Sequence, residues 1–243
     1  MLRIKLLASA AALSLAACGG GATESAPETT TPAPTEAAAP TETAEPTSGF
    51  AELEGVAGDY SLEVTHAYLA AYVGHGNGLS RYQISFTDID ADLSFDPAAP
   101  ETASISFSVN TAGVQTNYPG DYKGTHQNSA HDSWNDDIAN DGKWLNSTEF
   151  GTASFTSTSA TRTGDNTGTV TGDLTLLGQT GTVTFDVTYN GNGKSRRSEA
   201  ALLGFDATTT INRSEWGMGA FIPVVSDDVR LDFSGEFIQD LAE

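Results

Sequence analysis

The chain has 243 residues with 32 acidic and 11 basic side chains, and its formal net charge at pH 7 is −21. So acidic a surface repels phosphate backbones and anionic headgroups, which argues against nucleic acid as a partner. The chain holds one cysteine, so no disulfide framework can stabilise it and an apolar core must do so.

Residues 1–17 have the layout of a secretory signal peptide, because two basic residues precede an apolar run too short for a permanent membrane span. The run ends in the letters LAAC at residues 15–18, which resemble the bacterial lipobox. The resemblance implies cleavage before Cys18 and lipid modification of that cysteine. Gly19 after it implies an outer-membrane anchor facing the periplasm. The alternative is an ordinary signal peptide with a chance cysteine.

Residues 18–49 contain no aromatic side chain and no aliphatic side chain larger than alanine. Nothing there can offset the entropy lost when a chain is ordered, so this segment, rich in Pro, Thr, Glu and Ala, is predicted to be a disordered tether. A flexible-coil estimate gives it a mean reach of roughly 30 Å. The folded domain is therefore expected at residues 50–243, which is enough chain for one sizeable core.

The clearest strand pattern lies at residues 167–192. Four apolar side chains there alternate with polar ones, which places them on one face of a strand: Val183, Phe185, Val187 and Tyr189. The preceding run carries the same pattern at Val170, Gly172, Leu174 and Leu176, and the glycine-bearing connection 177–181 joins the two runs. The pattern predicts a β-hairpin, which needs further strands to bury its apolar face.

Alternating runs recur on both sides of this hairpin. They occupy residues 60–66, 81–86, 89–95, 105–109, 152–157, 205–211 and 229–237. We count about eight strands, most of them joined by short turns. The predicted fold is all-β, an eight-stranded antiparallel barrel of the up-and-down kind. A two-sheet sandwich has the same sequence signature and is the alternative.

Residues 111–149 break this rhythm and are rich in Asn, Asp, Gly, His and Trp. A connection of this length inside a compact domain is usually a functional loop that contains a short helix. We expect that helix within residues 133–145, where Trp134, Ile138 and Leu145 have near-helical spacing.

The sequence contains partial matches to catalytic and metal-binding motifs, but their residues do not have the spacing that those motifs require. A calcium loop starting at Asp137 would have Ala139 at its third position and Thr148 at its twelfth, so its ligand geometry fails. The four histidines show no metal-ligand spacing on one element, and there is no Gly-x-Ser-x-Gly nucleophile elbow. No metal site and no enzyme activity are expected.

The tract TGDLTLLG at residues 171–178 resembles the YceI-like family of exported, lipocalin-like, polyisoprenoid-binding proteins. Further motifs agree in order: GDYSL at 58–62 with His66, LSFDP at 93–97, VQT at 114–116, FTST at 155–158 and GFDATTTINRSEWGM at 204–218. The resemblance covers about residues 57 to 238 and implies an eight-stranded barrel flanked by a short helix. It also implies that the interior holds the isoprenoid tail of a quinone or an isoprenoid phosphate, and no other cofactor.

Inward-facing positions of such a barrel must be apolar and not too bulky. Twelve residues fit that description and are the expected ligand contacts: Phe107, Val109, Phe155, Leu174, Val183, Phe185, Val187, Phe205, Ala207, Ile211, Leu231 and Phe233. The same residues could instead fill a dry core, in a scaffolding or adhesive lipoprotein with a solid barrel. A small hydrolase is the third hypothesis, and it requires a Ser, a His and an Asp brought together by folding.

Overall fold

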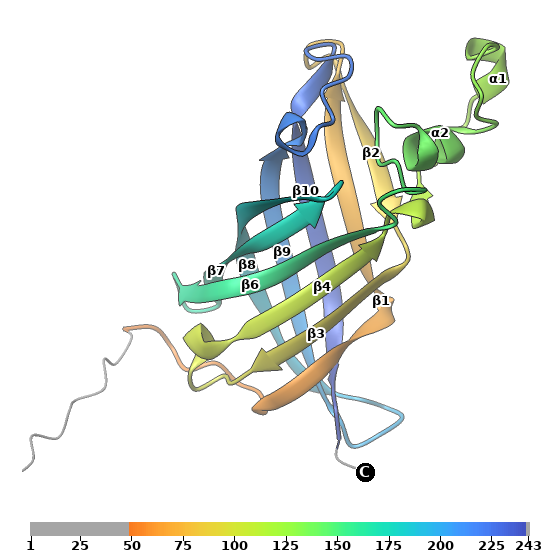
Figure 1. Cartoon of the computed structure of the whole chain (residues 1–243). Coiled ribbons are helices and arrows are strands. Elements are labelled where there is room, and N and C mark those ends of the chain that lie inside the picture. The colour runs from red at the N-terminus through yellow and green to blue at the C-terminus, as the bar shows by residue number, and fades with distance from the viewer. Residues whose placement is uncertain (1–48, 242–243) are drawn as a thin grey trace, which may run out of the picture. The chain divides into compact units, whose positions relative to one another are not determined.

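The computed structural model describes residues 49–241, so the expected signal peptide, Cys18 and nearly all of the tether lie outside the described residues. The described chain forms ten antiparallel strands (Figure 1). They are β1 (Gly58–His75), β2 (Ser80–Phe86), β3 (Ile89–Phe95), β4 (Ser104–Asn110), β5 (Val114–Gln115), β6 (Thr152–Arg162), β7 (Thr167–Leu176), β8 (Gln179–Lys194), β9 (Ala201–Asn212) and β10 (Val225–Gln239).

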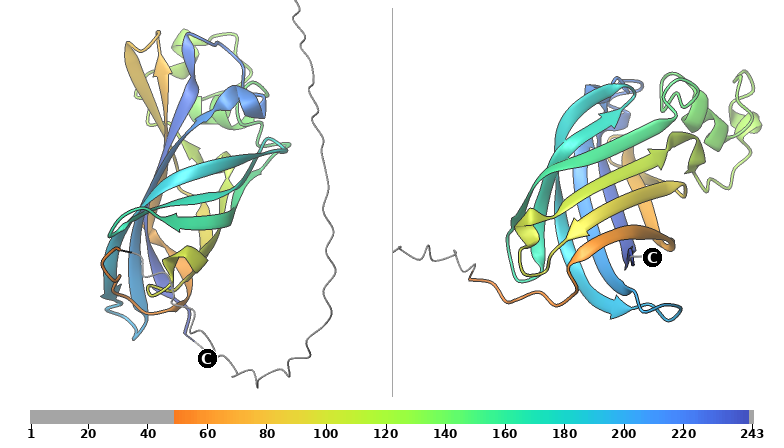
Figure 2. Two further views of the ribbon diagram at one scale, coloured as in Figure 1. Left: turned by 90° about the vertical axis from the view of Figure 1, so that its left-hand side faces the viewer. Right: turned by 60° about the horizontal axis from the view of Figure 1, so that its bottom comes forward.

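Eight of these strands close into a barrel, in the order β1-β3-β4-β6-β7-β8-β9-β10, and β10 pairs back with β1 (Figure 2). The closing β10–β1 ladder excludes the two-sheet sandwich and confirms the predicted barrel. Along β1 the neighbour changes: Gly58–Ser61 pair with β3, and Leu69–His75 pair with β2. Within the described chain, residues 80–84 of β2 have a ladder partner on the β1 side only.

The predicted hairpin is formed by β7 and β8, and Val170 lies opposite Phe185 in its register. The connection is shorter than expected. Only Leu177 and Gly178 form the turn, with φ of 52° and 70°, and Gln179 already pairs with Leu176. Two positive φ values give the type I′ turn that matches the twist of a two-residue hairpin.

The first strand is longer than the predicted 60–66 and runs on to His75. Leu69, Ala70 and Ala71 are all buried, so both faces of β1 are covered there. A strand covered on both faces loses the alternation of apolar and polar residues that reveals it in a sequence. The predicted strand ends at residue 66, beside the register shift between Leu62 and Ala67, and the two-sided burial beyond it hides the rest of β1.

The long connection contains two short helices, α1 (Tyr122–Thr125) and α2 (Trp134–Asn140). The expected helix is α2. The Ser133 side chain caps it by accepting a hydrogen bond from the Asp136 backbone N–H, and it ends before the buried Leu145. Helix α1 is a single turn, too short to give a periodic signal. No helix in residues 49–241 has the length and apolar character needed to cross a membrane.

Gly172 on β7 allows a close approach that no other residue would permit. A Cβ atom built there would lie 2.3 Å from the Thr156 carbonyl oxygen, 2.6 Å from the Phe155 ring and 2.7 Å from Ser157 Cα. The β6–β7 register shifts between Ser157 and Ser159, immediately beside this contact. The missing side chain thus lets β6 bend over β7 and brings the Phe155 ring against the wall.

One end of the barrel is closed. Tyr60 is fully buried and its hydroxyl donates to the Val56 carbonyl, while the Tyr189 hydroxyl donates to the Glu54 carbonyl. These bonds hold the chain that precedes β1 across the end of the barrel, where it packs on Leu203. The figures show this segment beneath the strands, at the end opposite α1 and α2 (Figures 1 and 2).

Candidate ligand-binding cavity

The interior of the barrel is hollow. A cavity of about 1210 Å³ is lined by residues from the barrel strands and from the long loop that contains α1 and α2. Its size exceeds the roughly 300–1,000 Å³ of typical small-molecule sites. The interior therefore has room for a long ligand, which a close-packed core would not provide.

The structure brings together eleven of the twelve residues expected to face a ligand. On the cavity wall lie Phe107, Val109, Phe155, Leu174, Phe185, Val187, Phe205, Ala207, Ile211, Leu231 and Phe233. Their contact with a ligand remains a prediction. Val183 is buried but is not among the residues that line the cavity. It lies opposite Gly172, where the Phe155 ring packs closely against the wall, and Phe155 and Phe185 lie 5.1 Å apart at their centroids.

Aromatic rings shape the deep end of the cavity. Phe205 lies between Phe95, at 5.4 Å, and Phe237, at 5.9 Å, and it also contacts Tyr189 at 5.2 Å. The first two pairs are edge-to-face, an arrangement that aromatic rings favour. These rings fill the barrel near its closed end, so the cavity ends blindly there and is apolar at its base.

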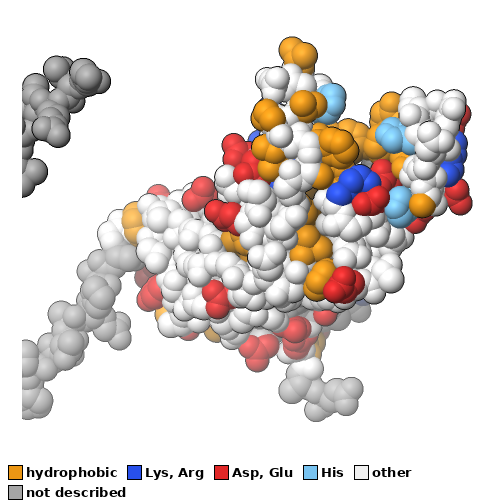
Figure 3. Space-filling model, turned by 45° about the horizontal axis from the view of Figure 1, so that its top comes forward, with side chains coloured by type: hydrophobic (Ala, Val, Ile, Leu, Met, Phe, Trp, Pro, Cys, Tyr) orange, Lys and Arg blue, Asp and Glu red, His pale blue; other side chains and the backbone are white. Residues whose placement is uncertain are grey.

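The other end of the cavity is bordered by three segments. They are the turn between β1 and β2, the long loop from residue 118 to residue 145, and the stretch between β9 and β10 that includes the 3-10 helix Arg213–Trp216. Figure 3 shows hydrophobic side chains around a hollow at this end, with basic, acidic and histidine side chains on one side of it. We call this end the mouth. None of its residues was among the expected ligand contacts, because the loop has no periodic pattern that would show which side chains turn inward.

Three residues that line the cavity, one on β2 and two in the loop, carry buried hydrogen-bond donors. The Tyr82 hydroxyl and the indole N–H groups of Trp134 and Trp144 are shielded from solvent and have no hydrogen-bond partner in the described structure. Burial raises the pKa of Tyr82. Its neighbour Thr116 donates its own hydroxyl proton to Asn135, at 2.8 Å. Buried polar groups without a partner are rare and costly, so these three donors are the least satisfied polar groups among the residues that line the cavity.

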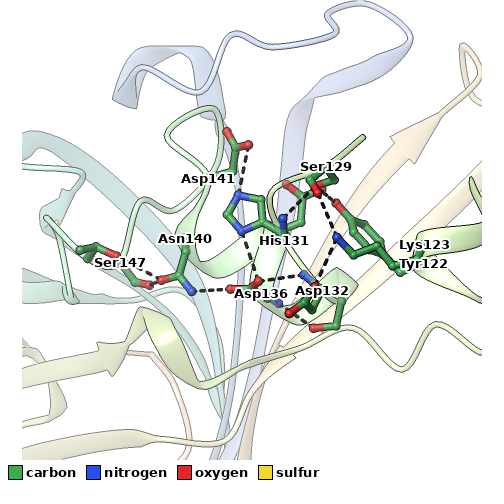
Figure 4. Close-up of polar contacts among 12 residues, drawn as sticks. Tyr122, Lys123, Ser129, His131, Asp132, Asp136, Asn140, Asp141 and Ser147 are labelled. Carbon is green, nitrogen blue, oxygen red and sulfur yellow. Dashed lines mark hydrogen bonds and ion pairs between the residues drawn. The ribbon is translucent and has the colours of Figure 1, made fainter. Parts of the chain in front are cut away.

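A network of charges holds the loop beside the mouth (Figure 4). The two ring nitrogens of His131 lie 3.3 Å from an Asp136 oxygen and 3.4 Å from an Asp141 oxygen. The Lys143 ammonium lies 2.9 Å from Asp137 and 2.5 Å from Asp141. Burial would lower the pKa of Lys143, but its hydrogen bonds to these two carboxylates outweigh burial and raise it.

The same network could be mistaken for a metal site. His131, Asp137 and Asp141 present ligand atoms within 4.8 Å of one another. The ammonium of Lys143, however, bridges the two carboxylates. The three residues are therefore held as members of an ion-pair network, and the acidic groups have a protein cation as their partner.

We expect this loop to loosen in acid before the barrel unfolds. Hydrogen bonds from Asn140 lower the pKa of Asp136, and those from Lys143 lower the pKa of Asp141. A carboxylate with a lowered pKa stabilises the fold above the unfolded value of about 3.9, and that contribution is lost as the pH falls through the folded-state pKa. Tryptophan emission should thus shift below about pH 4, ahead of the far-ultraviolet circular dichroism of the sheet. A single coincident transition would contradict this.

Comparison with known proteins agrees with this architecture. The model of the YceI-like domain matches residues 60–237. A UPF0312 protein of Ectopseudomonas mendocina is 34% identical over 188 residues, which cover 76% of this chain and 90% of the relative. A UPF0312 protein of Pseudomonas fluorescens (strain SBW25) is 35% identical over 186 residues, covering 76% and 88%.

Two solved structures share the fold. The crystal structure of Burkholderia cenocepacia BcnA superimposes with a TM-score of 0.60 at 23% identity, covering 72% of this chain and 98% of BcnA. A polyisoprenoid binding domain from Saccharophagus degradans, implicated in plant cell wall breakdown, has a TM-score of 0.50 at 14% identity and covers 74% and 98%.

A closed eight-stranded barrel with a large apolar interior and a mouth among its loops has the architecture of a lipocalin-like binding protein. This chain belongs to the YceI-like family, as its matched domain and its relatives show. The family assignment confirms the resemblance read from the TGDLTLLG tract and from the motifs that accompany it.

Proposed function

We propose that this protein binds a long-chain isoprenoid lipid, with the tail inside the barrel and the head group at the mouth. This proposal rests mainly on the distribution of polar groups in the cavity. The deep walls are apolar, and the donors without a partner lie on β2 and in the loop near the mouth. A quinone carbonyl or a prenyl phosphate oxygen would accept hydrogen bonds from those donors when their side chains turn toward the cavity, because the donor atoms are shielded without the ligand. The polyisoprenoid-binding domain of the same fold supports this ligand class.

Organic extraction of the purified protein followed by mass spectrometry tests the proposal. We expect about one prenyl lipid per barrel, and the mass of its head group distinguishes a quinone from a phosphate. Stoichiometric straight-chain lipid would reject the isoprenoid class, and an empty extract after expression in a prenyl-lipid-producing host would reject binding. The scaffolding alternative required a solid barrel, which the cavity does not support.

Tyr82→Phe should change stability and lipid retention in opposite directions. Removing a buried hydroxyl that has no partner should leave the thermal midpoint of the lipid-free protein unchanged or raise it, because its desolvation cost of about 1–3 kcal/mol disappears. Lipid retention should fall about three- to tenfold, the value of one lost hydrogen bond. Tyr68→Phe, at an exposed tyrosine on β1, is the matched control and should change neither quantity. Unchanged retention in Tyr82→Phe would reject this contact.

We further propose that the protein acts in the cell envelope, held by lipid on Cys18 at the outer membrane and facing the periplasm, where it stores, carries or senses its ligand. Cys18→Ser should then abolish lipid modification, since the thiol is the acylation site. Metabolic labelling with a fatty acid measures this effect. A Cys18→Ser protein that still incorporates the label would contradict the anchor.

A further inference from the structure

Large apolar side chains protrude into solvent around the mouth. Leu79 at the β1–β2 turn is 90% exposed, and Phe221 and Val224 in the β9–β10 connection are 60% and 50% exposed. Ile222 beside them and Tyr118 on the long loop are also exposed. Single exposed apolar residues are ordinary, but five of them on three segments around one cavity entrance form a surface feature that needs a partner. We call these five residues the rim.

Hydrogen bonds hold the backbone of two of the three rim segments in place. The Gly76 backbone N–H donates to the Val224 carbonyl at 2.8 Å, which joins the two apolar turns. The buried Arg213 guanidinium donates to the carbonyls of Ala220 and Val225, at 2.8 Å and 3.0 Å. These bonds hold the backbone of the turn that carries Phe221 and Val224 at the mouth. Phe221 also lines the cavity, and its ring lies 5.9 Å from that of Trp144, yet 60% of it is exposed to solvent.

The rim is also free of formal charge. Residues 69–80, 111–120 and 217–226, which carry the five rim side chains, contain no Asp, Glu, Lys or Arg, although the chain has 32 acidic and 11 basic residues. Elsewhere the acidic surface repels anionic headgroups. Uncharged apolar side chains at the tips of turns on an acidic protein are suited to a neutral surface with an apolar interior and not to an anionic one.

We propose that the rim inserts into the surface of a zwitterionic lipid bilayer, so that the mouth opens into the membrane interface. The five side chains stand on three separate segments around an opening, and Figure 3 shows hydrophobic groups protruding at this end. Aromatic and aliphatic side chains at turn tips bury their apolar area in the headgroup region. The inference that a lipid passes through the mouth depends on the proposed function. The inference that the protein docks on a bilayer depends only on the exposed rim residues.

Flotation with phosphatidylcholine vesicles tests the docking. The chain from Gly19 onward is suitable, because it lacks the expected leader and the Cys18 anchor and retains the compact unit Ser48–Glu243. We expect it to float with the vesicles, and the double variant Leu79→Asp/Phe221→Asp to bind at least tenfold more weakly. Val64→Asp, at an exposed valine of β1 outside the rim, is the matched control and should bind like the unmodified chain.

Three outcomes would overturn the docking: no flotation of the unmodified chain, equal binding of all three proteins, or a dimer that the double variant disrupts without any vesicle binding. The extractable lipid of each protein is measured in parallel. A double variant that retains its lipid but no longer floats supports docking and leaves the proposed function intact. A protein that contains no lipid but floats with vesicles, and loses this binding in the double variant, would support docking and reject the proposed ligand.

Discussion

Ala207→Trp is expected to remove at least nine-tenths of the extractable lipid, about a tenfold loss, from a barrel that still folds. Ala207 lies on β9 between Val187 of β8 and Phe233 of β10, and all three residues line the cavity. The added indole would enter the space that the lipid tail is proposed to occupy. In a close-packed core the same change would cost about 1–3 kcal/mol or more, but a cavity of about 1210 Å³ can accept it.

The matched control is Thr210→Trp, which places the same indole on the exposed face of the same strand. It should keep both the lipid and the thermal midpoint of the unmodified protein. Val187→Trp, on the neighbouring strand, should reproduce the loss of lipid. Lipid per mole and the thermal midpoint are measured for all four proteins. A folded Ala207→Trp variant with unchanged lipid would reject the proposed lining.

Gly172→Val should cause a large loss of stability. Its Cβ would meet backbone atoms of Thr156 and Ser157 at 2.3 Å and 2.7 Å, so the two strands would have to separate. Overpacking costs about 1–3 kcal/mol, and contacts with backbone this short should place the cost at about 3 kcal/mol or above. At roughly 2–4 °C per kcal/mol, the thermal midpoint should fall by at least about 6 °C.

Gly193→Val is the control for strand glycines, because the nearest atom to a Cβ at Gly193 is 3.9 Å away. The thermal midpoint of Gly193→Val should fall by less than half of the decrease expected for Gly172→Val. Phe155→Ala in the Gly172→Val background should not restore stability, since the backbone contacts would persist. Equal midpoints for the two valine variants would show that β6 can move away from β7 at little cost.

The fold could be predicted because most barrel strands have one wet face. Val183, Phe185 and Tyr189 follow the period of two that such a strand requires, and β3 repeats it from Ile89 to Phe95. The signal failed where the burial was two-sided, as at Leu69–Ala71 of β1. Local pattern therefore predicts the wall of the barrel and misses the places where other segments cover its outer face.

The candidate site could be predicted only in part, for a related reason. Alternation identifies which face of a strand points inward, so the expected wall residues were found. It cannot separate an inward side chain that meets empty space from one that a neighbour covers, which is how Val183 came to be included. The donors Trp134 and Trp144 belong to a loop that is held by ion pairs among its own side chains, such as those of His131 and Lys143, and such pairs leave no periodic pattern in the sequence.

The change of partner along β1 gives the barrel a seam. Residues 80–84 of β2 have no ladder on the side away from β1, and the Tyr82 and Tyr118 rings, 6.4 Å apart, bridge that side by side-chain contact. Opening the seam therefore breaks no ladder hydrogen bond of residues 80–84, whereas separating β7, β8 and β9 from one another would break continuous ladders. Local fluctuations should be concentrated there, and amide hydrogens of β2 should exchange faster than those of β8 and β9. A branched chain wider than the resting mouth could then enter sideways, through the wall, without the barrel unfolding.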